Sequence, residues 1–330
     1  MIASVKKLLR RILQIDKRRA MVFYRHDCAR FLACSGVGGR ITRGTLQAKI
    51  IMHYHVVEKG LTMPNRHLAF GKGIVANLIK LIREFSARFG VEDAQVRHAV
   101  GVLKEYRELH RSQGFDFSSD PAYWQDLSHF LDAYADIGVA HQHHVTFDGF
   151  YAANEGPFPD FAKSRHSVRN YTQNEIPMPR LEAAVSLALT TPSACNRQYC
   201  KVHCLSGERK KKLLELQGGN RGFGHLADKV LVVTSSLEGI ASPEERNDIF
   251  VNGGMFLMNL CYALHYHKIA HCILTWAQPL AKDATAREII GPALGKEETL
   301  IALLSCGEAP EEFDVADSPR KSLEEVFVHE

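Results

Sequence analysis

The stretch FAKSRHSVRNY, residues 161–171, gathers positive side chains and hydroxyls with almost no apolar cover. Within it, Arg165 and Arg169 are four residues apart, and Ser167 lies between them. Two guanidinium groups with a hydroxyl form a natural grip for a phosphate, because a guanidinium donates forked hydrogen bonds to anionic oxygens. A solvated charged surface is the alternative, and these residues alone do not decide between the two.

A second stretch, TTPSACNRQYCKVH at residues 190–203, has the chemistry of a binding turn. Pro192 ends a helical pattern, Ser193 follows among small residues, and Asn196 and Gln198 come just before a strand-like segment. Small side chains let a flat ligand approach the backbone, and two carboxamides can donate to and accept from its polar edge. The alternative is a helix stop followed by an ordinary turn.

The elements that must position these stretches alternate along the second half of the chain. Two prolines in EGPFPDF, residues 155–161, break any helix there and mark a boundary. Beyond it, hydrophobic periodicity and breaker residues predict an α+β or α/β layout in which helices cover a sheet. The predicted helices lie near 179–189, 208–217, 249–267 and 283–290, and the predicted strands near 200–207, 229–235, 270–276 and 299–307.

The first part of the chain has a different pattern. Only Pro64 and Pro121 fall within residues 1–150, and apolar residues recur at helical spacing over 74–89 and 96–109. We therefore expect a mostly helical N-terminal region over residues 1–155, followed by an α+β domain over residues 156–330.

Charge is unevenly distributed. The net charge is +4, but residues 1–20 alone carry +6, so the remainder is about −2, which argues against a nucleic-acid binder with a wholly basic surface. In that segment Val5, Leu8, Leu9, Ile12 and Leu13 share one helical face with cations opposite. It predicts either a basic amphipathic helix on an anionic membrane surface or a solvated helix packed on its own domain.

Cysteines and hydropathy favour a cytoplasmic protein. The eight cysteines are scattered without a C-x-x-C pair, which is typical of reduced thiols. No segment approaches the roughly 18 continuous apolar residues of a membrane span, and charges interrupt the first segment too often for a signal-peptide core.

Histidines form three groups. His53, His55, Glu58 and His67 are residue types that ligate metals, but a polar helix face leading into a turn needs no metal to explain them. The group at residues 141–144 either titrates on the surface or lines a ligand pocket. The group at residues 265–271 straddles a helix end, where imidazoles commonly cap carbonyls. We expect no metal site.

Taken together, the two polar stretches resemble the FMN-dependent nitroreductase family. That family opens its domain with an Arg-x-Ser-x-Arg/Lys segment and, after one helix, carries a Pro-Ser-x-x-Asn-x-Gln turn. The similarity runs from about Phe158 to the end of the chain and implies an FMN-binding sheet covered by helices. The matching residues are Arg165, Ser167, Arg169, Pro192, Ser193, Asn196 and Gln198.

The resemblance also implies roles for these residues. Arg165 and Ser167 would hold the FMN phosphate and ribityl chain, together with Arg320 and Lys321 from the C-terminal stretch SPRKSLEEVF. Arg169 would lie near the pyrimidine edge of the flavin. The turn over residues 192–198 would reach across a dimer interface to the flavin of the neighbouring subunit.

Three further residues are weaker candidates. Asn220 is a second candidate for the pyrimidine edge. Thr275 and Trp276 occupy the place from which relatives direct a backbone N–H toward flavin N5. Here the sequence departs from a common family pattern, because it has no Pro-x-Glu-Gly.

The activity implied by the resemblance is that of a homodimeric oxidoreductase. It would take hydride from NADH or NADPH and pass it to an unidentified acceptor by a two-step exchange, with no side chain acting as a nucleophile. A His-x-x-Glu-Lys-Gly-Leu segment at residues 55–61 resembles those that accompany nitroreductase-like domains of bacterial polysaccharide gene clusters. The alternatives are a flavin-binding or membrane-surface partner protein without turnover, and a metal hydrolase built on the histidines.

Overall fold

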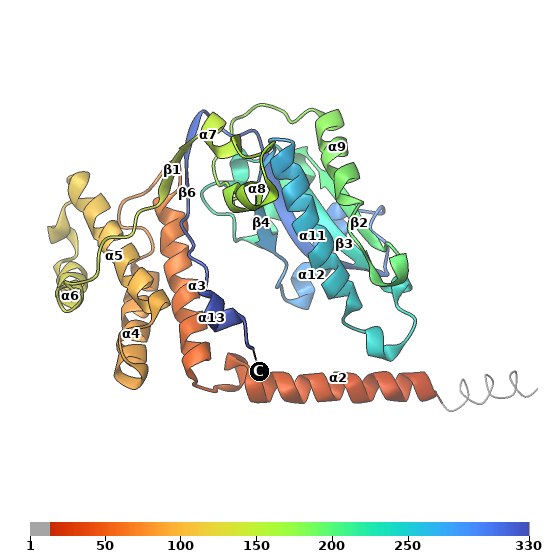
Figure 1. Cartoon of the computed structure of the whole chain (residues 1–330), viewed down its shortest axis with the longest axis horizontal. Coiled ribbons are helices and arrows are strands. Elements are labelled where there is room, and N and C mark those ends of the chain that lie inside the picture. The colour runs from red at the N-terminus through yellow and green to blue at the C-terminus, as the bar shows by residue number, and fades with distance from the viewer. Residues whose placement is uncertain (1–13, 330) are drawn as a thin grey trace, which may run out of the picture. The chain divides into compact units, whose positions relative to one another are not determined.

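The computed structural model describes residues 14–329, so most of the basic segment 1–20 lies outside the described residues. The chain divides into two compact units (Figure 1). One unit contains residues up to Ala33 and Thr146–Phe313, and the other contains Cys34–Val145 and Asp314–Glu330. This division differs from the expected boundary at residues 155/156, because the chain enters the helical unit after residue 33 and returns to it at residue 314.

The helical unit is built on four long helices: α3 (Arg43–Leu61), α4 (Lys72–Phe89), α5 (Ala94–Ser112) and α6 (Pro121–Asp132). Side chains cap the starts of two of them, α3 and α5. Thr42 and Thr45 form a reciprocal cap at the start of α3, and the Asp93 carboxylate accepts from the first backbone N–H groups of α5. The helical patterns over 74–89 and 96–109 are confirmed as α4 and α5.

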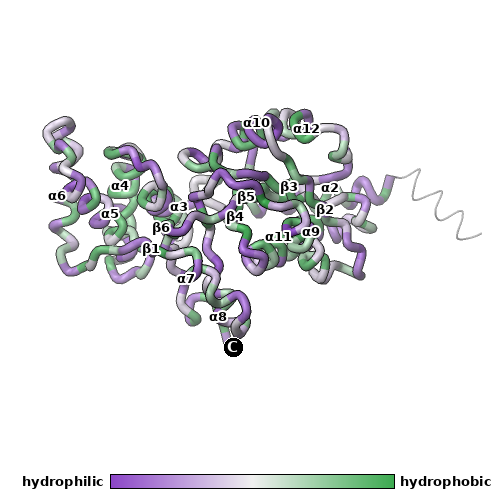
Figure 2. The backbone as a smooth tube through the Cα atoms, turned by 90° about the horizontal axis from the view of Figure 1, so that it is seen from above, coloured by the Kyte–Doolittle hydropathy of each residue, from purple (hydrophilic) through white to green (hydrophobic). Residues whose placement is uncertain are grey.

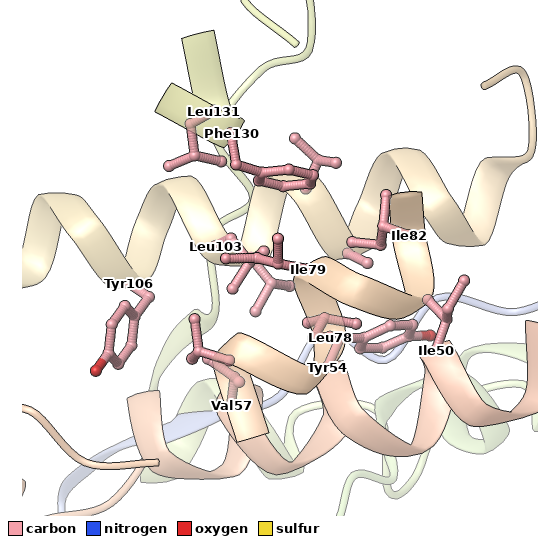
Figure 3. Packing of buried hydrophobic residues seen from close by; sticks show 14 of the residues in the cluster. Ile50, Tyr54, Val57, Leu78, Ile79, Ile82, Leu103, Tyr106, Phe130 and Leu131 are labelled. Carbon is pink, nitrogen blue, oxygen red and sulfur yellow. The ribbon is translucent and has the colours of Figure 1, made fainter. Parts of the chain in front are cut away.

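Apolar side chains from all four helices meet in one core (Figure 3). Leu78, Ile79 and Ile82 form the buried stripe of α4, and Leu103 and Tyr106 of α5 are fully buried with them. The spacing of three and four residues places each set on one helix face, which is why the sequence pattern predicted these helices.

The second unit holds a four-stranded antiparallel sheet in the order β2-β3-β5-β4. Its strands are β2 (Cys200–Leu205), β3 (Lys229–Ser236), β4 (Ala270–Thr275) and β5 (Glu298–Gly307). The central strand β3 is buried along its whole length, consistent with its hydrophobic run in Figure 2. The prediction of an α+β fold is confirmed.

Two pairs of helices cover this sheet, one pair on each side (Figure 2). Helices α9 (Met178–Ala188) and α11 (Asp248–Tyr266) share one apolar core with β3 and β5. Helices α10 (Gly207–Gln217) and α12 (Leu280–Ile290) pack against each other, and α10 also packs against β3. Every helix and strand expected after residue 178 is present.

Several short elements were not predicted from the sequence. They are α7 (Phe147–Tyr151), α8 (Phe158–Ser164), α13 (Leu323–Val326) and a two-stranded sheet of β1 (His143–Thr146) with β6 (Glu312–Val315). The prolines of residues 155–161 do interrupt the helices, but they also begin α8. Pro157 occupies the N-cap position of this helix and Pro159 lies in its first turn, where a missing N–H costs nothing.

A buried carboxylate joins three strands of the larger sheet. Glu298 on β5 accepts hydrogen bonds from Thr234 Oγ1 at 2.5 Å, His203 Nε2 at 2.7 Å and Lys201 Nζ at 2.9 Å. Burial raises the pKa of Glu298, but these hydrogen bonds outweigh it and lower the pKa to about 2. The group is therefore satisfied as an anion.

A similar network lies in the helical unit around Glu58 of α3, which is fully buried. Its carboxylate accepts from His98 Nε2 at 2.7 Å and from His55 Nδ1 at 3.1 Å. Ser318 N and Oγ, from the C-terminal segment, lie 3.4 Å from the two carboxylate oxygens. His55 and Glu58, which the sequence offered as metal ligands, here bond each other.

Across residues 14–329, no group of three or more metal-ligating side chains is arranged to hold an ion. The eight cysteines are free thiols. None of the described helices is both long and apolar enough to cross a membrane.

Removing a fully buried side chain tests the helical core. Leu103→Ala should lower the free energy of unfolding of the helical unit by about 2–5 kcal/mol, because a cavity replaces packed methyl groups. Trp124 of α6 reports on this unit, and in a Trp276→Phe background it is the only tryptophan. Denaturant titration followed by its fluorescence measures the change. Met52→Ala, at a position 59 % exposed on α3, is the control and should shift the transition little.

The Glu58 network makes stability depend on pH. Burial raises the pKa of Glu58, but hydrogen bonds from His55 and His98 outweigh it and lower the pKa to about 2. Because the folded pKa lies below the unfolded value, the stabilisation is present above about pH 4.3 and is lost as pH falls toward 2. Glu58→Gln should cost roughly 1.5–3 kcal/mol at pH 7.

That cost should shrink steadily when denaturant titrations are repeated at lower pH, down to about pH 3. Glu108→Gln, at an exposed position on α5, makes the same change in charge and should have little effect at any pH. Equal stability of the Glu58 variant and the parent protein at pH 7 would show that the network contributes nothing.

Candidate functional site

The segment after α8 runs along the ends of two strands. Val168 N donates to His271 O on β4 at 3.0 Å, and Thr172 N donates to Glu308 O just after β5 at 2.8 Å. Tyr171 fixes the segment against β5, because its hydroxyl bonds Ser305 and its ring fills the space where a Cβ on Gly307 would stand. Glycine at position 307 therefore permits this close approach.

Arg165 begins this segment at the end of α8, and its side chain is half-buried. Its Nη1 atom is buried without a hydrogen-bond partner among the described residues. Two buried imidazoles, His265 and His271, lie close enough for the guanidinium charge to act on their pKa values. No carboxylate in the described part of the chain pairs with Arg165, so its charge is uncompensated.

Both imidazoles are neutral at physiological pH. Burial lowers the pKa of His265 to about 3, and the charge of Arg165 acts in the same direction. Burial likewise lowers the pKa of His271 to about 4. His265 Nε2 bonds Ser164 Oγ at 2.8 Å, and His271 Nδ1 lies 3.0 Å from the carbonyl of Ile269, to which it donates. Neutral rings keep the surroundings of Arg165 free of competing charge.

The sequence did not single out His265, His271 or Ser164 for this role. The prediction that the histidines cap carbonyls fits only part of their contacts, namely the bond from His271 to Ile269 O. A signal was present in the sequence: His271 is a polar residue inside the otherwise apolar strand AHCILT.

The other two members of the predicted phosphate grip lie on the same segment. Arg169 is 5 % exposed, and its Nη1 lies 3.4 Å from Ser167 O. Ser167 is half-buried. The structure therefore brings Arg165, Ser167 and Arg169 together along one stretch of backbone at the edge of the sheet.

The turn at residues 192–198 has a strained backbone. Cys195, Asn196 and Gln198 have φ values of 50°, 55° and 50°, in the left-handed region that residues other than glycine rarely adopt. Ser193 Oγ accepts from Gln198 N at 2.9 Å, and Gln198 Nε2 donates to Asn196 Oδ1 at 3.0 Å. Backbone strain of this kind persists only where the surrounding structure holds it in place. It is found most often at ligand-binding and active sites.

Asn252 of α11 holds this turn and was not among the predicted site residues. Its Oδ1 accepts from Ala194 N at 2.8 Å, and its Nδ2 donates to Asp248 O at 2.7 Å. A cavity of about 30 Å³ lies beside the turn, and its lining includes Pro192, Ser193, Gln198 and Asn252. The sequence signal that could have identified Asn252 is an asparagine on the buried face of an otherwise apolar helix.

Two of the weaker candidates, Asn220 and Thr275, are linked through Gln217 at the opposite end of β4 from His271. Asn220 Nδ2 donates to Leu214 O at 2.7 Å and Gln217 Oε1 at 3.0 Å, so this amide is committed inside the protein. Gln217 Nε2 in turn donates to Thr275 O at 3.2 Å. Trp276 Nε1 donates to Asp283 Oδ1 at 3.0 Å, which fixes the indole at the start of α12.

Arg320 and Lys321 belong to the helical unit. Arg320 Nη1 donates to the carbonyl of Ser318, and Lys321 lines a cavity of about 450 Å³ with Arg43 and Asp93. Their predicted place beside Arg165 stays a prediction.

A larger cavity in the sheet unit has the wrong charge for a phosphate. It measures about 890 Å³ and is lined by five carboxylates and one cation, Arg180, which pairs with Glu308. A phosphate dianion would be repelled there, so the cations of the Arg165 segment remain the better anion site.

Comparisons with known proteins agree with the matched motifs. Residues 162–220 match the model of the nitroreductase family. This range includes the Arg165 segment, the strained turn and Asn220. No curated protein matched the chain.

Several solved structures are similar to the chain. A nitroreductase family protein from Streptococcus pneumoniae is 18% identical with a TM-score of 0.45, over 53% of this chain and 100% of that one. One from Clostridium difficile is 18% identical with a TM-score of 0.43, over 53% and 98%. A mutant FMN- and NADPH-dependent nitroreductase from Sphigopyxis sp. strain HMH is 21% identical with a TM-score of 0.43, over 52% and 98%.

The expected resemblance is confirmed by the family match over residues 162–220. Residues 162–220, in the C-terminal half of this chain, therefore match the nitroreductase family.

Proposed function

We propose that the protein is an FMN-dependent oxidoreductase that takes hydride from NADH or NADPH and passes it to a second substrate. The observation that supports this most directly is the uncompensated guanidinium of Arg165, whose Nη1 is buried without a partner among the described residues. A half-buried cation without a counter-charge is unfavourable, and a phosphate dianion would supply both the charge and the acceptor oxygens.

The residues of the candidate site fit FMN. Arg165 and Ser167 would hold its phosphate and ribityl chain, and Arg169 would lie at the polar edge of its ring system. The strained turn supplies the carboxamides of Asn196 and Gln198. FMN, when bound, supplies the hydride-accepting and hydride-donating chemistry.

The protein's own side chains would bind and orient FMN. Arg165 would neutralise the phosphate. The neutral rings of His265 and His271 do not compensate the positive charge of Arg165, so all of it is available to the phosphate. Asn252 keeps the turn in its strained form through the bond to Ala194 N. The proposed mechanism assigns no nucleophile among the side chains.

We propose that a second copy of the chain completes the site. A cavity of about 30 Å³ holds little more than a water molecule, so one chain alone does not enclose a three-ring ligand at the turn. On α11, the same helix that carries Asn252, the side chains of Phe250, Val251 and Met255 are 55 %, 57 % and 41 % exposed. Such apolar exposure beside an incomplete site favours a homodimer.

The polysaccharide context remains part of the proposal. It rests on the His-x-x-Glu-Lys-Gly-Leu segment of α3, whose Glu58 is occupied by the buried network. Glu58 therefore has a structural role in this segment, and the segment does not by itself identify a substrate.

A comparison of FMN with riboflavin tests the phosphate grip. Arg165→Gln should weaken FMN binding at least about 30-fold, or roughly 2 kcal/mol, because a buried anion would lose its charged partner. Riboflavin has no phosphate, so its affinity should change little. Quenching of flavin fluorescence on titration with the apoprotein measures both constants.

Lys163→Gln is the matched control, since it removes an exposed cation two residues earlier and should leave both affinities unchanged. Equal losses for FMN and riboflavin would contradict a phosphate role for Arg165. A folded protein that binds no flavin would refute the proposed function as a whole. Flavin that binds but is not bleached by NADH or NADPH would favour the flavin-binding protein without turnover.

The Asn252 contact predicts a different pattern. Asn252→Ala releases Ala194 N and should relax the turn, so FMN and riboflavin should both bind about tenfold more weakly, the equivalent of one lost hydrogen bond to a buried donor. Asn259→Ala is the control, because Asn259 lies on the same helix and bonds the end of α9 and residues 190–191 instead of the turn. A selective loss of FMN binding in the Asn252 variant would contradict a role in the turn.

A further inference from the structure

Helix α2 (Ile15–Cys34) docks on the sheet unit through polar contacts. Asp27 pairs with Arg246, with distances of 2.6 Å to Nε and 2.9 Å to Nη2. The Arg246 guanidinium also lies over the ring of Phe23, 4.6 Å from its centroid, and Arg19 pairs with Glu244. Positions 19, 23 and 27 follow the four-residue spacing of one helix face, so this face points toward the protein.

Four exposed apolar side chains of α2 lie on another face, whereas Phe23 is on the docked face and Val22, 64 % exposed, lies outside both. No residue of this 20-residue helix is buried. Met21, Tyr24, Phe31 and Leu32 are 45 %, 59 %, 56 % and 50 % exposed. At 100° per residue these four fall within an arc of roughly 100°, centred about 130° from the docked face. The helix therefore makes its charged contacts inward and turns a stripe of four apolar side chains outward.

Cations border this stripe. Lys17, Arg18 and Arg25 are exposed, and helical spacing places them within or next to the arc of the apolar residues. The two acids of the helix, Asp16 and Asp27, fall on the docked side. The preceding sequence adds Lys6, Lys7, Arg10 and Arg11. The outward face of α2 thus combines apolar side chains with positive charge.

We propose that α2 is an interfacial helix that binds an anionic lipid surface through this outward face. Apolar residues would enter the boundary between headgroups and acyl chains, and the bordering cations would pair with lipid phosphates. A second copy of the chain fits less well. Pairing two α2 stripes would bring the same cations together without an acid between them, which is repulsive. The inference is independent of flavin binding.

Vesicle flotation with the full-length protein tests the inference. The protein should float with vesicles containing roughly 30 % phosphatidylglycerol and stay behind with pure phosphatidylcholine, and high salt should weaken the binding. Phe31→Ser with Leu32→Ser should reduce binding at least about tenfold through lost apolar burial. Arg18→Gln with Arg25→Gln should reduce it about tenfold through lost charge.

Two matched variants serve as controls. Lys211→Gln with Lys212→Gln removes two exposed cations from α10, and Leu280→Ser removes an 89 % exposed leucine from α12. Both should bind vesicles like the parent protein. The unfolding transition of each variant in solution distinguishes loss of binding from loss of fold.

Three results would overturn the inference. The first is a folded full-length protein that does not bind anionic vesicles. The second is an equal loss of binding in the α2 variants and in the controls. The third is an α2 variant that changes the oligomeric state in the absence of vesicles, which would identify a second copy of the chain as the occupant of the stripe.

Discussion

The candidate site depends on one electrostatic constraint, a half-buried guanidinium that lacks a counter-charge. Arg165 lies beside His265 and His271, and burial keeps both rings neutral. A carboxylate there would satisfy the cation permanently and leave nothing for a ligand. Two uncharged imidazoles tolerate the cation without cancelling it, so the positive potential persists at the edge of the sheet.

The sheet explains how this arrangement is held in place. The Arg165 segment is anchored to β4 by the bond from Val168 N to His271 O, and Tyr171 packs over Gly307 on β5. Helix α11 packs against the same sheet, and its Asn252 fixes the strained turn by accepting a hydrogen bond from Ala194 N. Both candidate stretches are thus irregular backbone fixed to regular elements, which gives them rigidity.

Much of this could be predicted from the sequence, for physical reasons. Hydrophobic periodicity revealed α4, α5 and the strands, because burial of one face is a local pattern. The match of Arg165 and Gln198 to a family motif pointed to the candidate site. The sequence could not reveal that His271 lies beside Arg165, since that proximity depends on the pairing of β4 with a segment about a hundred residues earlier. The positive φ of Cys195 was equally hidden, because nothing in a cysteine indicates a left-handed backbone.

The network around Glu58 has a consequence for how the chain acquires its structure during synthesis. Ser318, which approaches this carboxylate, is separated from it by 260 residues of sequence. While a ribosome is still making the sheet unit, α3 and α5 can already pack. The contact of Ser318 with the Glu58 carboxylate forms only after the strands of the sheet have been made. Synthesis of the helical unit thus begins before the strands of the large sheet are made and is completed after all of them.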